Sequence, residues 1–243
     1  MFESLLDPVF NPLLKLGALP AVIILSLLVS LLMVYIYKWM TNQDDMKQLK
    51  TDIKKYQKQM KELRKEPEKM MEMQKKVTKL NMKYMKESFK PTLVTFIPII
   101  IIFGWMNAHL YYEPINPLQE FDVDVIVDKN LKGNISVEVS EGLDIIGESS
   151  KTVENDKSVF TFKGDAGEHW MTFNFLDSSV QKNVLLTKEL KYAPPIEKFE
   201  GNIKSVNIHQ NKLKVLFGLS WLWTYIIFAV VFSMLLRKLL KVY

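Results

Sequence analysis

Three long runs without a charged side chain dominate the pattern of apolar and polar positions along the chain. They extend from about residue 16 to 37, from 93 to 112 and from 215 to 236. A bilayer core about 30 Å thick requires roughly 20 apolar residues in a helix. The runs therefore predict three transmembrane helices, which we assign with their flanks to residues 16–40, 91–112 and, together with a basic tail, 206–243.

The first run is too long for the apolar region of a signal peptide, and Lys15 is the only basic residue before it. We therefore expect a mature transmembrane helix. In residues 1–15, Pro8 and Pro12 interrupt a series of apolar residues. We expect a short amphipathic segment in the membrane interface there. Pro98 lies inside the second run and predicts a kink, because proline removes one backbone hydrogen bond.

Residues 41–90 have the periodicity of two helices. Apolar residues recur at alternating spacings of three and four, which is typical of a coiled-coil seam; they are Met46, Leu49, Ile53, Tyr56, Met60 and Leu63, then Met70, Met73, Val77, Leu80 and Tyr84. The break falls at Lys65-Glu66-Pro67, where proline disfavours helix in the residue before it. Because both ends of the segment enter the membrane from one side, we predict an antiparallel hairpin.

Residues 113–205 alternate apolar and polar positions in short stretches, for example at Phe121, Val123 and Val125, and turn residues separate the stretches. This pattern predicts an all-β, sandwich-like domain of six or seven antiparallel strands. Ala193-Pro194-Pro195 predicts its exit. The expected fold is thus an α-helical membrane protein with three transmembrane helices, a coiled-coil hairpin and an extracytoplasmic β-domain between helices 2 and 3.

The distribution of charge predicts the orientation. Lys38 to Lys90 contains 16 Lys/Arg and 8 Asp/Glu, whereas Glu113 to Lys212 contains 11 Lys and 17 Asp/Glu. Basic flanking segments stay in the cytoplasm. We therefore expect a multi-pass protein of the cell membrane, with residues 38–90 and the C-terminus inside, and the N-terminus and residues 113–212 outside.

The composition removes several kinds of chemistry. The chain has no cysteine, which excludes disulfides and thiolate sites. Its three histidines are too far apart in sequence to form a local pair of metal ligands. Asp165, Glu168 and His169 lie in one turn, but a solvated hairpin is favoured over a metal site there. No catalytic signature occurs, so we expect no enzyme, no cofactor and no metal. Asn134-Ile-Ser136 is a candidate glycosylation sequon.

Eight of the 13 methionines lie between residues 38 and 90. Methionine is flexible and suits a surface that accepts many apolar partners. The methionines that we expect to contact such partners are Met60, Met70, Met71, Met73, Met82 and Met85. Those in the seam are also interpreted as structural, whereas Met71, Met82 and Met85 fall outside the seam and favour an exposed binding surface.

Three stretches resemble archaeal relatives of the YidC/Oxa membrane insertases. They are YQKQMKELRKEPEKMMEMQKKVTKLNMKYMKESFKP, the following FIPIIIIFGWM, and GLSWLWTYIIFAVVFSMLLRKLL near the end. The resemblance covers about residues 16–112 and 210–243, and it extends to the insertase subunits of the endoplasmic reticulum membrane protein complex and of the guided-entry pathway. The β-domain departs from the short connection that this resemblance would imply.

The resemblance implies a protein that moves short polar tails across the bilayer and releases helices into lipid without nucleotide. It also implies a polar groove in the inner half of the membrane. The residues that could line this groove are Ser26, Ser30, Tyr35, Thr92, Thr95, Ser233 and Arg237. Packing between helices is the alternative for each hydroxyl, and anchoring of the helix end is the alternative for Arg237.

The partners expected on this basis are nascent membrane-protein clients, the ribosome through the basic hairpin, and anionic lipid; no DNA is expected. An ion channel or channel component is an alternative function, although the spans provide no ring of acidic residues for a pore. A receptor-like membrane tether with an external binding domain is another.

Overall fold

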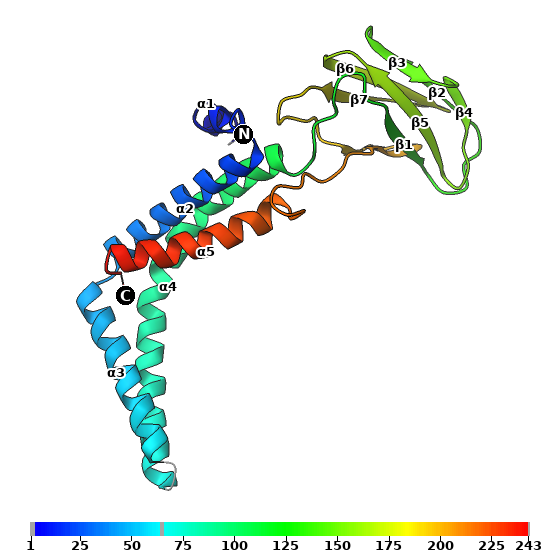
Figure 1. The fold of residues 1–243 in the computed structure, drawn as a ribbon. Coiled ribbons are helices and arrows are strands. Elements are labelled where there is room, and N and C mark those ends of the chain that lie inside the picture. Colours follow the sequence, from blue (N-terminus) through cyan, green and yellow to red (C-terminus); the bar gives the residue numbers. More distant parts are fainter. Residues whose placement is uncertain (1–2, 64–65, 243) are drawn as a thin grey trace. The chain divides into compact units, whose positions relative to one another are not determined.

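The computed structural model describes residues 3–63 and 66–242 (Figure 1). The helices are α1 (Glu3–Leu14), α2 (Ala18–Met40), α3 (Gln43–Glu62), α4 (Pro67–Leu110) and α5 (Trp221–Leu239). The strands are β1 (Phe121–Val127), β2 (Asn134–Val139), β3 (Leu143–Ile146), β4 (Ser150–Thr152), β5 (Lys157–Gly164), β6 (Gly167–Phe175), β7 (Ser178–Leu186), β8 (Ile196–Lys198) and β9 (Ile203–Ile208).

The chain divides into two compact units. The β unit consists of Met1–Ala21 and Trp105–Trp221, and the helical unit consists of Val22–Gly104 and Leu222–Tyr243. The prediction of three apolar helices is confirmed: within the described part of the chain, α2, α4 and α5 are long and apolar enough to cross a membrane. The predicted β region between the second and third of these helices is confirmed as two antiparallel sheets.

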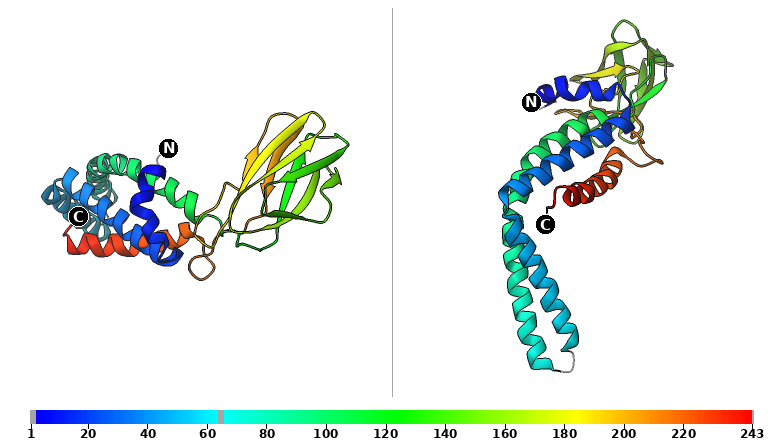
Figure 2. Two further views of the ribbon diagram at one scale, coloured as in Figure 1. Left: turned by 90° about the horizontal axis from the view of Figure 1, so that it is seen from above. Right: turned by 60° about the vertical axis from the view of Figure 1, so that its left-hand side comes forward.

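Helix α4 continues without interruption for 44 residues and contains both Pro91 and Pro98. At 1.5 Å per residue it is about 66 Å long, roughly twice the thickness of a bilayer core. Its N-terminal half is basic and its C-terminal half is apolar, so the predicted boundary at residue 90 falls inside one helix. Figures 1 and 2 show that α4 bends between these halves.

The three apolar helices contact one another within the helical unit. Helix α2 buries a face of small and branched residues, and the Ser30 Oγ donates to the carbonyl of Ala229 in α5 at 3.4 Å. The rings of Phe103 in α4 and Tyr225 in α5 meet edge to face with centroids 4.8 Å apart. Small residues at such contacts allow close approach of helix backbones in a membrane.

Helix α3 and the N-terminal half of α4 lie side by side and form an arm, residues 43–90 (Figures 1 and 2). Asn42 caps α3 by accepting from the backbone N–H groups of Asp44 and Asp45. All the residues of the predicted seam are buried or half-buried. The predicted break at residues 65–67 coincides with the end of α3 and the start of α4, although Lys65 itself lies outside the described residues.

The β unit has two sheets with a shared apolar core. The strand orders are β3-β5-β1-β9-β8 and β4-β2-β6-β7, and every pairing is antiparallel. Strands β1 and β5 alternate strictly between buried and more exposed positions, as the sequence pattern predicts. Their inward side chains, among them Val123, Val125, Phe160 and Phe162, pack against Phe173 of β6 in the other sheet.

The predicted exit from the β-domain at Ala193-Pro194-Pro195 and its end at residue 205 are wrong. Two more strands follow, and β9 pairs with β1 near the middle of the sheet. Its buried residues are Ile203, Val206 and Ile208, whose spacing of three and then two does not follow strict alternation. A β-bulge opposite Ile126 and Val127 shifts the register there, which hides the strand from a period-two pattern.

The third apolar helix is shorter than the predicted run from residue 215 to 236. Helix α5 begins at Trp221, and Val215–Leu219 form a tight turn instead. Phe217 and Gly218 both have positive φ angles, of 48° and 81°, which are incompatible with a right-handed helix. Apolar composition alone therefore predicted a longer helix than the backbone adopts.

Within the β unit, α1 is attached to the C-terminal end of α4. The indole Nε1 of Trp105 donates to Asp7 Oδ1 at 2.8 Å, and the ring of Phe10 meets the Trp105 ring edge to face at 5.1 Å. Trp105 is almost completely buried. The segment predicted to be interfacial is thus a helix held by the ring of Phe10 and by Asp7, whose Oδ1 also lies 3.6 Å from His109 Nε2.

The position of β9 in the sheet can be tested with two apolar truncations. Val206→Ala removes a fully buried side chain of β9, whereas Ile196→Ala removes a side chain of the edge strand β8 that is 55% exposed. We expect Val206→Ala to lower the free energy of opening of the β unit by about 1.5–3 kcal/mol and Ile196→Ala to change it by less than about 0.5 kcal/mol. Hydrogen exchange on the full chain in detergent measures both, and equal effects would contradict a central β9.

Candidate functional site

A cavity of about 250 Å³ lies where the arm meets the apolar helices of the helical unit. Residues from α2, α4 and α5 line it: Met33, Tyr37, Tyr84, Ser88, Pro91, Thr92, Thr95 and Arg237. Each of these three helices contains a long apolar segment that could cross a membrane. The cavity therefore gathers hydroxyl groups and one guanidinium at one end of an otherwise apolar bundle.

Tyr37 is at the centre of these contacts. Its hydroxyl shares a hydrogen bond of 3.1 Å with the Ser88 Oγ, which joins α2 to α4. The guanidinium carbon of Arg237 lies 4.8 Å from the centroid of the Tyr37 ring, which joins α2 to α5. An arginine over an aromatic face is a favourable cation–π arrangement, so one side chain ties the three helices together.

An apolar cluster, which we call the root cluster, packs beside the cavity at the base of the arm. Its buried members are Val34, Tyr37, Met46, Leu49 and Val242, with Leu80, Tyr84 and Leu236 partly buried around them. It brings together the end of α2, the start of α3, the middle of α4 and the residues after α5. The Lys38 Nζ also donates to the carbonyl of Leu240 at 3.1 Å. The base of the arm is thereby fixed to the end of α5.

Three of the predicted groove residues line the cavity, namely Thr92, Thr95 and Arg237. The Thr92 Oγ1 donates to the carbonyl of Ser88 and the Thr95 Oγ1 to that of Thr92, at 2.9 and 2.8 Å. Both hydroxyls are thus satisfied by their own helix, and each keeps acceptor capacity. The guanidinium of Arg237 is the principal source of donors in the cavity.

The other four predicted residues do not line this cavity. Ser26 and Ser30 are buried between helices, where Ser26 donates to the carbonyl of Ile23 and Ser30 to that of Ala229. Tyr35 is 65% exposed, and Ser233 is half-buried. The arrangement of Ser26 and Ser30 matches the packing alternative for these two residues.

The sequence patterns missed Tyr37 and Ser88 as members of the cavity and assigned Tyr84 only to the seam. Tyr37 was visible as an aromatic residue near the end of the first span, a position typical of interfacial aromatics. Ser88 precedes the boundary that charge counting placed at residue 90. No periodicity connects these two residues, because they meet only through the packing of α2 on α4.

An exposed apolar row, which we call the α4 stripe, runs along α4 from the arm into the apolar half. It consists of Met82, Met85, Phe89, Leu93, Phe96 and Ile100, each between 55 and 65% exposed. Spacings of three and four place these side chains on one face of a helix. Because α4 is unbroken, the stripe crosses from the basic segment to the apolar one without a gap.

The predicted methionine surface divides into two groups. Met71, Met82 and Met85 are 57, 64 and 65% exposed, and the last two belong to the α4 stripe. Met60, Met70 and Met73 are half-buried. The distinction between methionines inside and outside the seam is therefore visible in their exposure. Phe89 is a further exposed member, which the sequence patterns missed.

The cavity has a mixed polar and apolar lining. Its lining combines donors on Arg237, hydroxyls, and the apolar surfaces of Met33 and Pro91. The lining contains no pair of a nucleophile and a base. Such a lining can accept hydrogen bonds from, and donate them to, a polar segment that enters a mostly apolar bundle, which lowers the cost of desolvating that segment.

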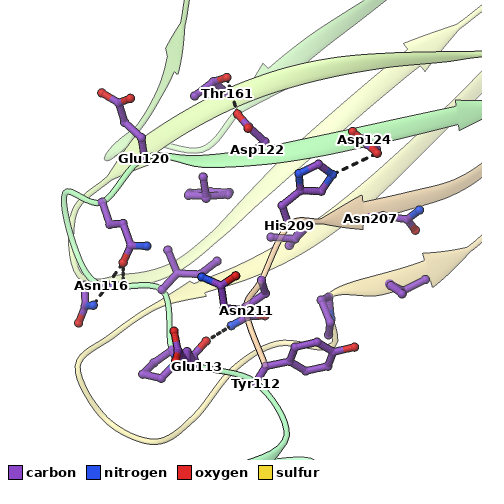
Figure 3. A pocket seen from close by; sticks show the side chains of 18 of the residues that line it. Tyr112, Glu113, Asn116, Glu120, Asp122, Asp124, Thr161, Asn207, His209 and Asn211 are labelled. Carbon is purple, nitrogen blue, oxygen red and sulfur yellow. Dashed lines mark hydrogen bonds and ion pairs between the residues drawn. The ribbon is translucent and has the colours of Figure 1, made fainter. Parts of the chain in front are cut away.

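A larger concavity of about 990 Å³ lies on the β unit (Figure 3). Figure 3 shows His209 pointing to Asp124, at 3.1 Å, and Thr161 bonded to Asp122. Lys157 also reaches Asp124 at 3.2 Å. Burial alone would raise the pKa of Asp124, but hydrogen bonds from His209 and Lys157 and their charges outweigh burial, so the pKa lies below its ordinary value. These contacts hold the sheet face together.

Two other residues singled out in the sequence have ordinary surroundings in the β unit. Both ring nitrogens of His169 are engaged, one with the Ser140 Oγ at 3.3 Å and the other with the carbonyl of Asp165 at 3.0 Å. Among the described residues no group of three His, Asp or Glu side chains could hold a metal ion. Asn134 is exposed at the start of β2, and its Oδ1 accepts from Thr152.

Comparison with known protein families gives a match to the first half of the chain. The family model described as "Integral membrane protein EMC3/TMCO1-like" matches residues 3–124, about half of the chain. This family lies within the Oxa1/YidC/Alb3 insertase superfamily, so the match confirms the resemblance to that superfamily. No curated protein and no solved structure matches the chain. The matched segment contains α1 to α4 and ends within β1.

The contact between Tyr37 and Ser88 can be tested by removing one hydroxyl. Tyr37→Phe keeps the ring under Arg237 but loses the hydrogen bond, so we expect the helical unit to lose about 0.5–1.5 kcal/mol of stability. Tyr35→Phe is the matched control, because Tyr35 lies in the same helix and is largely exposed. Thermal unfolding in detergent measures both, and equal melting temperatures for the two variants would contradict a structural role for the Tyr37 hydroxyl.

The pairing of Asp124 predicts a dependence of stability on pH. Folding lowers the pKa of this carboxyl, so its ionised form stabilises the folded state. This contribution is complete above the pKa of the unfolded chain, about 4, and is lost as the pH falls through the pKa of the folded chain. We expect Asp124→Asn to destabilise the β unit by about 1–3 kcal/mol at pH 7, with the difference from the unmodified chain shrinking below about pH 4. Hydrogen exchange at several pH values tests this, and a difference that stays constant with pH would refute it.

Proposed function

Because this chain belongs to the EMC3/TMCO1-like family of integral membrane proteins, we propose that it is an insertase or chaperone for nascent membrane proteins. In this proposal, transmembrane segments pass along the α4 stripe, and short polar tails enter through the cavity between α2, α4 and α5. The family is one of membrane-protein biogenesis, which supports a non-enzymatic role. The observation that carries the proposal is the α4 stripe, which runs from the basic arm past this cavity.

The stripe supports a route for an apolar client. Met82, Met85 and Phe89 are exposed in a segment that also carries Lys83, Lys86 and Lys90, so this half of α4 belongs outside the hydrocarbon. Large exposed apolar side chains in water are typical of sites that bind a partner. Methionine adapts to partners of different shape. A client helix could pass from this surface onto Leu93 and Phe96 without leaving an apolar contact.

The cavity supports a route for the polar part of the client. Thr92, Thr95 and Arg237 lie at the depth where the stripe enters the apolar half of α4. A polar tail that leaves water at this level loses hydrogen bonds, and each unpaired group costs several kcal/mol in hydrocarbon. Donors and hydroxyls in the cavity replace part of that hydration. Burial of the apolar client segment then drives insertion, with no nucleotide required.

The arrangement of charge supports an orientation. We place the arm and the residues after α5 in the cytoplasm, the β unit on the opposite side, and the protein in a cellular membrane. The arm is proposed to be an antiparallel coiled coil, and the two sheets are proposed to form a sandwich; the buried seam and the shared core support these assignments. The basic arm fits contact with ribosomal RNA or anionic lipid.

Reconstitution tests the function. The full chain in liposomes is offered a nascent single-span client with a short polar N-terminal tail, and the fraction of client protected from protease is measured. We expect Met85→Gln combined with Phe89→Gln to lower this fraction about threefold to tenfold, since each removes an apolar contact worth about 0.5 kcal/mol at a partly exposed site. Lys83→Gln, an exposed neighbour that lies outside the stripe, should have little effect.

Two outcomes would count against the proposal. If liposomes with the protein protect no more client than empty liposomes, insertion itself is wrong. If the protein is active but the stripe variants match Lys83→Gln, the α4 stripe is not the route. Thermal unfolding of each variant in detergent separates these outcomes from loss of folding.

A further inference from the structure

The chain makes an unusual tight turn immediately before α5. The backbone N–H of Val215 donates to the carbonyl of Leu219, and the N–H of Leu219 donates to the carbonyl of Leu216, both at 2.8 Å. The two central residues, Phe217 and Gly218, have φ angles of +48° and +81°. Positive φ at both central positions is the geometry of a type I′ turn, which favours Asn, Asp and Gly.

Phe217 is unfavourable at this position for two reasons, of which the first holds in any medium and the second only in water. A bulky residue with positive φ is uncommon, because its Cβ crowds the backbone. Its side chain is also 95% exposed, the highest value among the large apolar residues that the structure describes as exposed. An apolar side chain held at the tip of a strained turn indicates an apolar medium outside the protein.

The length of α5 indicates which medium this is. The apolar part of α5, from Trp221 to Leu236, contains 16 residues, or about 24 Å of helix. The whole of α5, 19 residues, is long enough to cross a membrane, but its last turn carries Arg237 and Lys238. A bilayer core is about 30 Å thick, so the uncharged part alone is roughly 6 Å shorter than the core. Arg237 and Lys238 place the C-terminal end of α5 at the headgroups. The turn immediately before Trp221 is therefore in the position from which the missing apolar length could be supplied.

Chain connectivity keeps the turn at the membrane boundary. Four peptide units separate Phe217 from Trp221, which limits the distance between their Cα atoms to about 14 Å. This limit holds for any placement of the β unit relative to the helical unit. Lys214 precedes the turn in the sequence and is exposed. Its side chain is long enough to reach lipid phosphates from the membrane boundary.

We propose that the turn Leu216–Leu219 is a membrane-inserted wedge that completes the third span. Phe217 occupies the boundary between headgroups and acyl chains in the leaflet at the N-terminal end of α5, and Lys214 lies among the headgroups. The partner is lipid rather than a client or a second protein. This assignment does not depend on insertase activity.

The absence of cysteine from the chain allows a direct test. Phe217→Cys and Leu176→Cys are each labelled with an environment-sensitive fluorophore, and the full chain is reconstituted into liposomes. Leu176 is the matched control, since it is also apolar, has a φ of +49°, is 59% exposed, and lies in the turn between β6 and β7. We expect nitroxide lipids to quench the fluorophore at position 217. We also expect this fluorophore to be at least about threefold less accessible to iodide than the one at position 176.

Equal accessibility to iodide at the two positions, with no quenching by lipid, would overturn the wedge. Protection of residue 217 from iodide without quenching by lipid would also overturn it, because a protein would then cover the turn. If Phe217→Cys fails to fold, the unmodified chain is exposed to photoactivatable lipid. Adducts on the peptide that contains residues 215–219 support the wedge, and adducts confined to the apolar helices refute it.

Discussion

The unbroken backbone of α4 is the constraint on which the rest of the structure depends. A helix satisfies its backbone hydrogen bonds within itself, so it can leave water and enter hydrocarbon without exposing unpaired groups. Because α4 is continuous from Pro67 to Leu110, the second helix of the arm and the second apolar span form one element. Pro91 removes one N–H donor inside this element, yet the helix bends without ending. The α4 stripe and the cavity can therefore lie beside one another along a single helix.

The sequence predicted those features that follow from periodicity or length. The three apolar helices, the seam of the arm and strands such as β1 and β5 are of this kind, because a single local pattern determines each. Strand β9 was misjudged because a β-bulge interrupts its alternation. The start of α5 was misplaced because hydrophobicity does not report the positive φ angles at Phe217 and Gly218. Tyr37 and Ser88 were missed because their contact depends on how two helices pack.

The proposed route combines two features that do not favour stability in isolation. The exposed apolar side chains of the stripe do not contribute the free energy that burial would give. The hydroxyls and the guanidinium at the end of an apolar bundle need hydrogen-bond partners. Contacts around Tyr37 and in the root cluster offset these costs. The α4 residues of this route lie within the part of the chain that matches the family, residues 3–124, whereas most of the β unit lies outside it.

The central claim is that a client follows one face of α4 from the arm into the membrane. Site-specific photocrosslinking tests it most directly, with a probe placed in turn at each position from 82 to 100 of the full chain while a ribosome-bound client is held part-way through insertion. The account predicts crosslinks that rise and fall with the helical period, with maxima at Met82, Met85, Phe89, Leu93 and Phe96. Crosslinks of equal strength around the helix, or with maxima on the opposite face, would contradict it.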